Sequence, residues 1–178
     1  MEAFFITAPG QTGYGQVAEP ALQPDEVLLR PRVLGFCGSD LNTWRGRNPL
    51  VQYPRIPGHE IGAVIETVGQ AVPADLRPGQ MVTVSPYSNC GQCPACRQQR
   101  PNACRNNQTL GVQRDGALTE LLAVPWQRVV PTTKLGLVEL ALVEPLTIGF
   151  HAVARGRVTA GETVAVLGPS GSGKSTLL

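Results

Sequence analysis

Residues 90–104, CGQCPACRQQRPNAC, hold four of the five cysteines of the chain. These are Cys90, Cys93, Cys96 and Cys104. The C-x2-C spacing lets a tight turn direct two thiolates at one ion, and two further sulfurs complete a closed, tetrahedral zinc site. Residues 88–107 lack apolar periodicity, so metal binding would replace hydrophobic burial in ordering them. Two disulfides or four free thiols are the alternatives, and disulfides are disfavoured without a secretory signal. We therefore predict a structural zinc lobe.

Short β segments flank this lobe on both sides. They are rich in β-branched and bulky residues, and turn residues at 9–15 and 20–25 bound the first two. Val27, Leu29, Pro31 and Val33 share one face of the second, as in a half-buried strand. A short helical turn is expected within 38–46. The expected strands cover residues 1–8, 26–36, 60–69, 79–86, 117–125 and 127–131. The sequence thus predicts a mostly β barrel domain over residues 1–135, including the lobe.

Composition narrows the class of protein. The 178 residues, 42% of them hydrophobic, suit one domain and part of a second. A net charge of +2, with 15 scattered basic residues, argues against a nucleic acid or membrane partner. No apolar stretch is expected to reach the length of a membrane span, and the opening MEAFFITAPGQTG does not have the pattern of a signal peptide. We expect a soluble, cytoplasmic protein.

A second set of metal-binding residues lies outside the lobe. Cys37 ends a predicted strand in GFCGSD, and His59 precedes another in PGHE. Separately, each is more often a small buried side chain or a structural imidazole. Together with Glu60 and Glu144 they supply a soft ligand, an imidazole and hard oxygens. Such a set forms the open, three-ligand site that catalytic zinc needs.

The order of these motifs resembles that of the zinc-dependent medium-chain alcohol and polyol dehydrogenases. GFCGSD, PRIPGHEIGAVIETVG, the cysteine lobe and VEPLTIGFHA carry the resemblance, which covers residues 1 to about 168. It implies a GroES-like barrel that holds catalytic zinc and a Rossmann domain that holds NAD or NADP. It also implies a small-molecule alcohol substrate and, for the full-length family, a homo-oligomer.

The resemblance assigns roles to individual residues. Cys37, His59 and Glu144 would be the catalytic zinc ligands, and Glu60 an alternate ligand. Ser39 would accept the alcohol proton, and Asp40 would orient the zinc-bound histidine. Glutamate at position 144, where dehydrogenases of simple alcohols usually have cysteine, favours a secondary alcohol of a polyol, sugar or sugar acid.

Four other positions say less about function. Asn42 and Trp44 could face the substrate, although a structural tryptophan is an equal alternative. His151 is expected to be structural. Ala63 stands where the family often has glycine, so the packing of its strand could differ slightly.

The C-terminal part, residues 136–178, is expected to be the start of a nucleotide-binding α/β domain. Helical spacing from residue 137, interrupted at Pro145, is followed by a buried-type strand at 161–168 and the loop GPSGSGKSTLL. In this loop Gly168, Ser170 and Gly173 match the Rossmann turn, whose backbone amides, including that of Gly171, would hold a pyrophosphate.

The same loop carries a competing signal. Lys174 and Ser175 complete a triphosphate-binding loop, and the last 18 residues resemble an ABC-type ATPase. ATP hydrolysis is not expected, because no acidic strand follows. The chain is therefore predicted to be a truncated dehydrogenase, inactive alone. The alternative is a non-catalytic, zinc-stabilised GroES-like fragment or chimera whose loop weakly binds nucleotide phosphate.

Overall fold

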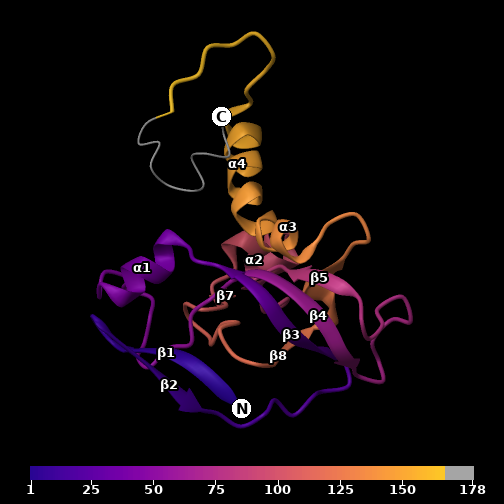
Figure 1. Ribbon diagram of the computed structural model, residues 1–178. Helices are drawn as coiled ribbons and strands as arrows, with labels where there is room; N and C mark the ends of the chain where they lie inside the picture. The colour runs from indigo at the N-terminus through magenta and orange to yellow at the C-terminus, as the bar shows by residue number, and fades with distance from the viewer. Residues whose placement is uncertain (167–178) are drawn as a thin grey trace.

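A five-stranded antiparallel sheet forms the body of the chain in the computed structural model, which describes residues 1–166 (Figure 1). The strand order is β8-β3-β4-β5-β9. The strands are β3 (Glu26–Gly35), β4 (Glu60–Val68), β5 (Met81–Val84), β8 (Leu122–Pro125) and β9 (Val129–Pro131). Each lies within a segment predicted as β, so these predictions are confirmed.

Bulges bend the long pair β3–β4 around the core. The register shifts between Leu28 and Leu29 and again between Pro31 and Val33, and such shifts increase the local twist of a strand. Val27 and Leu29 are fully buried, but Pro31 and Val33 beyond them are only half-buried. The core cluster is Val27, Leu29, Ile61, Ala63, Ile65, Leu76, Val82, Val84, Leu110, Ala117, Leu122, Val124 and Val129. Ala63, where the family often has glycine, is thus a core residue.

The N-terminal segment is a hairpin of β1 (Glu2–Ala8) and β2 (Gln11–Gln16). The prediction of a turn over residues 9–15 is therefore wrong for most of that range. Gly10, with φ of 74°, makes the tight turn, and the following residues pair with β1. Edge-to-face packing of Phe4 and Tyr14, with ring centroids 5.4 Å apart, contributes to this pairing.

Three of the helices follow strands of the five-stranded sheet. Helix α1 (Gly38–Trp44) follows β3, and α3 (Leu137–Ala141) and α4 (Val143–Gly156) follow β9. Pro145 lies in the first turn of α4, where a missing N–H is tolerated. The predicted interruption therefore falls at Leu142 and not at Pro145. Helix α3 packs on β4, while α4 extends away from the body (Figure 1).

These two helices contradict the expectation that no apolar stretch reaches the length of a membrane span. Together they form a 20-residue helical stretch, Leu137–Gly156, with a mean hydropathy of 1.5, which is long and apolar enough to cross a membrane. Length and composition are weak evidence for a span, because core helices pass the same test. Here Leu140 and Ala141 are buried, and the acidic Glu144 lies within the stretch and is buried too.

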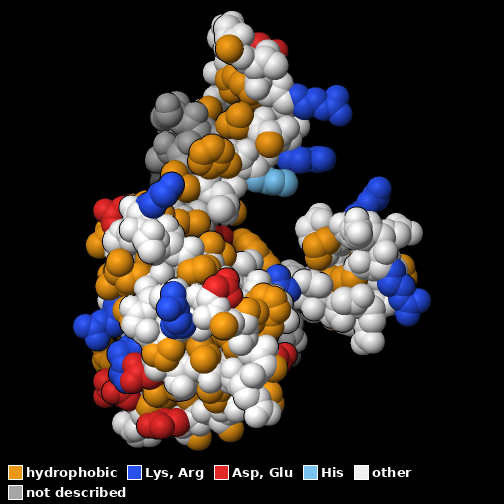
Figure 2. All heavy atoms as spheres, turned by 90° about the vertical axis from the view of Figure 1, so that its right-hand side faces the viewer, with side chains coloured by type: hydrophobic (Ala, Val, Ile, Leu, Met, Phe, Trp, Pro, Cys, Tyr) orange, Lys and Arg blue, Asp and Glu red, His pale blue; other side chains and the backbone are white. Residues whose placement is uncertain are grey.

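The cysteine lobe projects from the barrel as a separate knob (Figure 2). Its root is the short pair β6 (Tyr87–Ser88) and β7 (Gln108–Thr109), and its tip carries α2 (Pro94–Arg97) and a 3-10 turn, η1 (Pro101–Ala103). A second 3-10 turn, η2 (Trp126–Arg128), precedes β9 on the barrel side. Within 88–107 only Cys93 and Cys104 are buried. The prediction that this segment lacks an apolar core is confirmed.

The expected strand at 161–168 is not formed in its described part, since residues 162–166 have no strand assignment. A strand needs a hydrogen-bonded neighbour, and no described segment pairs with these residues. The predicted nucleotide-binding residues of the glycine loop lie outside the described residues. They are Gly168, Ser170, Gly171, Gly173, Lys174 and Ser175.

Candidate metal centres

The four lobe sulfurs converge on one point. The Sγ atoms of Cys90, Cys93, Cys96 and Cys104 all lie within 4.8 Å of one another. The Cys93–Cys96 and Cys90–Cys104 sulfurs are each 3.5 Å apart. All four are free thiols, because a disulfide would need a separation of about 2.0 Å. Tetrahedral zinc with Zn–S bonds of about 2.3 Å spaces its sulfurs about 3.8 Å apart. The lobe therefore fits a closed zinc site.

Backbone amides further prepare the lobe for a metal. The amides of Cys90 and Asn106 donate to the Cys104 sulfur at 3.4 and 3.3 Å. Hydrogen bonds from the backbone of Cys96 and Arg105 lower the pKa of Cys93 to about 6. Burial raises the pKa of Cys96 to about 11. Thiolates are the metal-binding form of cysteine, and the amides stabilise that form at part of the site.

Strand pairing builds the second cluster. Gly35, near the end of β3, lies opposite Glu60 at the start of β4, so Cys37 just beyond β3 meets His59 just before β4. Ligand atoms of Cys37, His59 and Glu60 lie within 4.8 Å of one another. A side chain at position 35 would overlap the Glu60 carboxylate, 2.0 Å from Oε2. Glycine there leaves the space that Glu60 occupies.

Asp40 connects the two segments that carry the ligands. Its Oδ2 accepts a hydrogen bond from the Cys37 amide at 3.0 Å, and its Oδ1 accepts one from the Gly58 amide at 3.4 Å. Gly58 has φ of 103°, a conformation that favours glycine. Asp40 Oδ1 also lies 3.8 Å from Nδ1 of His59, a buried nitrogen without a hydrogen bond. Asp40 thus faces the imidazole edge opposite Nε2.

The cluster is strongly acidic. Cys37, Asp40, Glu60 and Glu144 surround a single basic group, His59. The hydrogen bond with His59 lowers the pKa of Cys37, while burial raises the pKa of Glu60. Burial opposes the charged imidazole, but the hydrogen bond with Cys37 and the charge of Asp40 outweigh it and raise the pKa of His59 to about 9. Sulfur, nitrogen and carboxylate donors in a buried, acidic set fit a divalent cation such as zinc.

Glu144 approaches this cluster from α4. It is buried, and its charge acts on both His59 and Glu60. Its Oε1 accepts a hydrogen bond from the Tyr87 hydroxyl at 2.7 Å. Burial and this hydrogen bond raise the pKa of Tyr87 above its usual range. The structure thus groups Glu60 with Cys37 and His59. Glu144 lies beside this close set of three residues and is held by Tyr87.

Other predicted residues are placed as follows. Ser39, in the first turn of α1, has its Oγ 3.5 Å from Nε2 of His59. Asn42 and Trp44 are exposed on α1, and His151 is exposed on α4. The sequence reasoning missed Tyr87. Its position three residues before the first lobe cysteine was the only signal, and pairing with a residue 57 positions away is not visible in the sequence.

The comparisons with known proteins relate the chain to one family of dehydrogenases. The alcohol dehydrogenase GroES-like domain family matches residues 23–134. L-galactonate-5-dehydrogenase of Escherichia coli K12 is 37% identical over 99% of this chain and 52% of its own length. Sorbitol dehydrogenase of Bacillus subtilis 168 is 37% identical over 84% of this chain and 43% of its own. The chain spans about half the length of the curated relatives that it matches.

Solved structures share the fold. A zinc-binding dehydrogenase of Sinorhizobium meliloti 1021 bound to NADP has a TM-score of 0.83 and 32% identity, covering 91% of this chain and 47% of that one. Galactitol-1-phosphate dehydrogenase of Escherichia coli has a TM-score of 0.81 and 30% identity, covering 88% and 45%. The sheet described above is the GroES-like half-barrel of these enzymes. Relatives of this chain are named as dehydrogenases, one of them as a zinc-type alcohol dehydrogenase-like protein. The chain therefore belongs to the alcohol dehydrogenase GroES-like domain family.

Proposed function

We propose that this chain is the zinc-holding, substrate-binding part of an oxidoreductase that oxidises a secondary alcohol of a polyol, sugar or sugar acid with NAD or NADP. The observation that carries the proposal is the convergence of Cys37, His59 and Glu60, with Glu144 beside them. These donors come from three separate segments, and a purely structural role would not require such a set. Relatives named as dehydrogenases of L-galactonate and sorbitol support the substrate class.

The residues would divide the chemistry between them. Zinc held by Cys37 and His59, with Glu60 or Glu144, would supply a Lewis acid toward the alcohol oxygen. Ser39 would accept the alcohol proton, because its hydroxyl lies beside His59 Nε2 on the cluster side of α1. Asp40 would hold the imidazole through the opposite ring edge. Cys90, Cys93, Cys96 and Cys104 would hold a second zinc that only stabilises the lobe.

NAD or NADP would bind through a nucleotide-binding domain that begins near residue 136. The backbone amides at Gly168, Ser170, Gly171 and Gly173 would hold its pyrophosphate. Cytoplasmic location and homo-oligomerisation belong to the same proposal. The competing candidate is a non-catalytic, zinc-stabilised fold whose terminal loop, with Lys174, weakly binds a nucleotide phosphate.

Metal analysis of matched histidine variants tests the site. The chain has two histidines, one in the cluster and one exposed on α4. We expect two zinc ions per chain in the wild type and in His151→Ala, but one in His59→Ala. Cys37 should resist alkylation by iodoacetamide only when both ions are bound. One zinc in the wild type, with Cys37 freely alkylated, would refute the catalytic site.

The alcohol site is tested with cobalt in place of zinc, since the cobalt absorption spectrum reports its ligands. Sorbitol or a sugar acid should change the spectrum of the wild type and of His151→Ala, but not that of His59→Ala. A spectrum that no alcohol changes would favour the non-catalytic alternative.

A further inference from the structure

A cavity of about 390 Å³ is lined by residues of the lobe and of the barrel, and Figure 2 shows the lobe projecting from the barrel as a knob. This volume falls in the range of small-molecule sites. Its lining is rich in hydrogen-bonding side chains. They are Ser85, Ser88, Asn89, Asn102, Asn107 and Arg128. Hydroxyl and amide groups at this density suit a hydroxylated ligand, since both types can donate and accept.

Arg128 gives the cavity its charge. It is the only charged residue that lines the cavity, and no described carboxylate lies in the lining. Arg128 forms no ion pair among the described residues. Apart from its cysteines, the neighbouring segment 88–107 carries only positive charges, at Arg97, Arg100 and Arg105. An anion entering here would meet a guanidinium that no acid neutralises.

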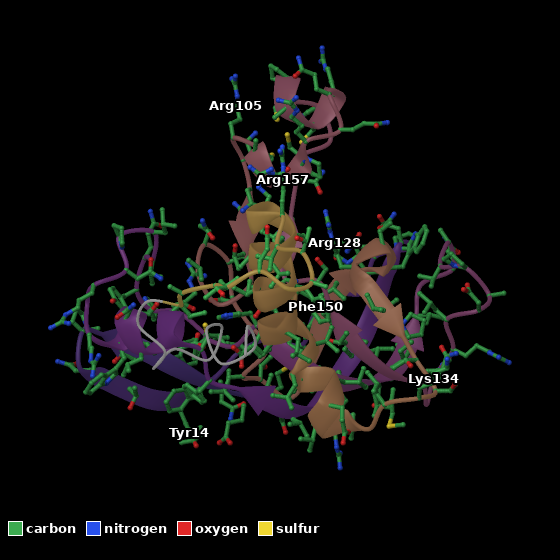
Figure 3. The ribbon with its side chains drawn as sticks, turned by 90° about the horizontal axis from the view of Figure 1, so that it is seen from above. Tyr14, Arg105, Arg128, Lys134, Phe150 and Arg157 are labelled. Carbon is green, nitrogen blue, oxygen red and sulfur yellow. The ribbon has the colours of Figure 1, made fainter. Side chains whose placement is uncertain are left out.

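The guanidinium is held in place. Ser85 donates its amide hydrogen to the Arg128 carbonyl at 2.8 Å, which fixes the backbone at the end of η2. The side chain donates from Nη2 to Oδ1 of Asn89 at the lobe root, and Figure 3 shows Arg128 on the barrel side of the lobe. This contact uses one of five N–H donors. Arg128 therefore has N–H donors left for a ligand, and its position is already fixed before a ligand binds.

Tyr87 connects this cavity to the metal cluster. It lines the cavity, and its hydroxyl donates to Glu144 beside the cluster. The Tyr87 side chain thus lines the cavity and contacts Glu144, which lies beside the cluster. A ligand with an alcohol at the cluster could extend past Tyr87 toward Arg128.

We propose that this cavity binds the anionic end of the substrate, so that Arg128 selects a sugar acid or a sugar phosphate over a neutral polyol. The inference rests on the proposed function, because it assigns the cavity to the substrate of that metal site. Carboxylate and phosphate share the required chemistry, since guanidinium binds both in a bidentate manner.

Calorimetric titration of the zinc-loaded chain tests the proposal, with gluconate, sorbitol 6-phosphate and sorbitol as probes. At least one anion should bind about tenfold or more tightly than sorbitol, and the tighter anion identifies the substrate class. Arg128→Gln should remove this preference, so that neither anion binds more tightly than sorbitol. Arg77→Gln, in an exposed turn elsewhere, is the matched control and should behave as the wild type.

Three results would overturn the inference. They are equal binding of anions and sorbitol by the wild type, retained preference in Arg128→Gln, and an equal loss in Arg77→Gln. The number of zinc ions per chain, measured on the same samples, distinguishes a failure of this inference from a failure of the proposed function. Two ions without anion preference refute only the cavity, whereas one ion with Cys37 open to alkylation refutes the catalytic site whatever the anions do.

Discussion

Replacing Gly35 by alanine should weaken metal binding at the proposed catalytic site, the cluster of Cys37, His59 and Glu60, without unfolding the barrel. The added Cβ would lie 2.0 Å from Oε2 of Glu60 and 2.9 Å from its Cβ, whereas real Cβ contacts are almost never below 3.0 Å. The Glu60 carboxylate must therefore move by at least about 1 Å. Metal ligands tolerate errors of about 0.2 Å, so the displacement is about five times too large.

The expected loss of metal affinity can be taken from the effect of changing residues that orient metal ligands in other proteins. Changes in the residues that orient metal ligands reduce metal affinity by about 10–100-fold. We expect this loss at one of the two zinc sites of Gly35→Ala, measured by competition with a chromogenic chelator. The lobe site, with four sulfurs far from Gly35 in the sequence, should keep its affinity.

Gly38→Ala is the matched control. It lies three residues away, at the first position of α1, and an added Cβ there would meet nothing within 4 Å. Its two zinc affinities should equal those of the wild type. The reasoning is refuted if Gly35→Ala binds both ions as tightly as the wild type, or if Gly38→Ala loses one ion to the same extent.

Three further results are expected. Cys93→Ser should bind one zinc ion less, and its residues 88–107 should become sensitive to proteases, while the β-sheet signal in circular dichroism stays the same. A lobe that stays resistant to proteases would show that metal does not order it. Leu29→Ala should lower the free energy of unfolding by about 2–5 kcal/mol in urea titration, because Leu29 is fully buried, whereas the exposed Leu50→Ala should lose little; equal losses would contradict the assigned core. Tyr87→Phe removes the hydrogen bond to Glu144 and should lower the zinc affinity of the proposed catalytic site about tenfold or more, while the affinity of the lobe site stays the same. An unchanged affinity at both sites would show that Glu144 needs no support from Tyr87.

Strands and the cysteine lobe could be predicted because their signals are local. Alternation in β3 and C-x2-C spacing each depend on residues only a few positions apart. The hairpin strand β2 was missed because its glycines indicate a turn, and only pairing with β1 makes that segment extended.

The cluster was only partly predictable. Cys37 and His59 could be named, but the pairing of Gly35 with Glu60 decides which carboxylate enters the close set. The Tyr87–Glu144 hydrogen bond and the arginine cavity both depend on where the lobe root meets the barrel. Contacts between segments tens of residues apart leave no periodic signal in one sequence.

X-ray absorption at the zinc edge, on the Cys93→Ser chain with its lobe site disabled, tests the central claim most directly. The claim is that Cys37, His59 and a carboxylate bind one ion. The remaining zinc should show a single sulfur neighbour at about 2.3 Å and nitrogen or oxygen neighbours at about 2.0–2.2 Å. No bound zinc, or zinc without any sulfur neighbour, would contradict the claim.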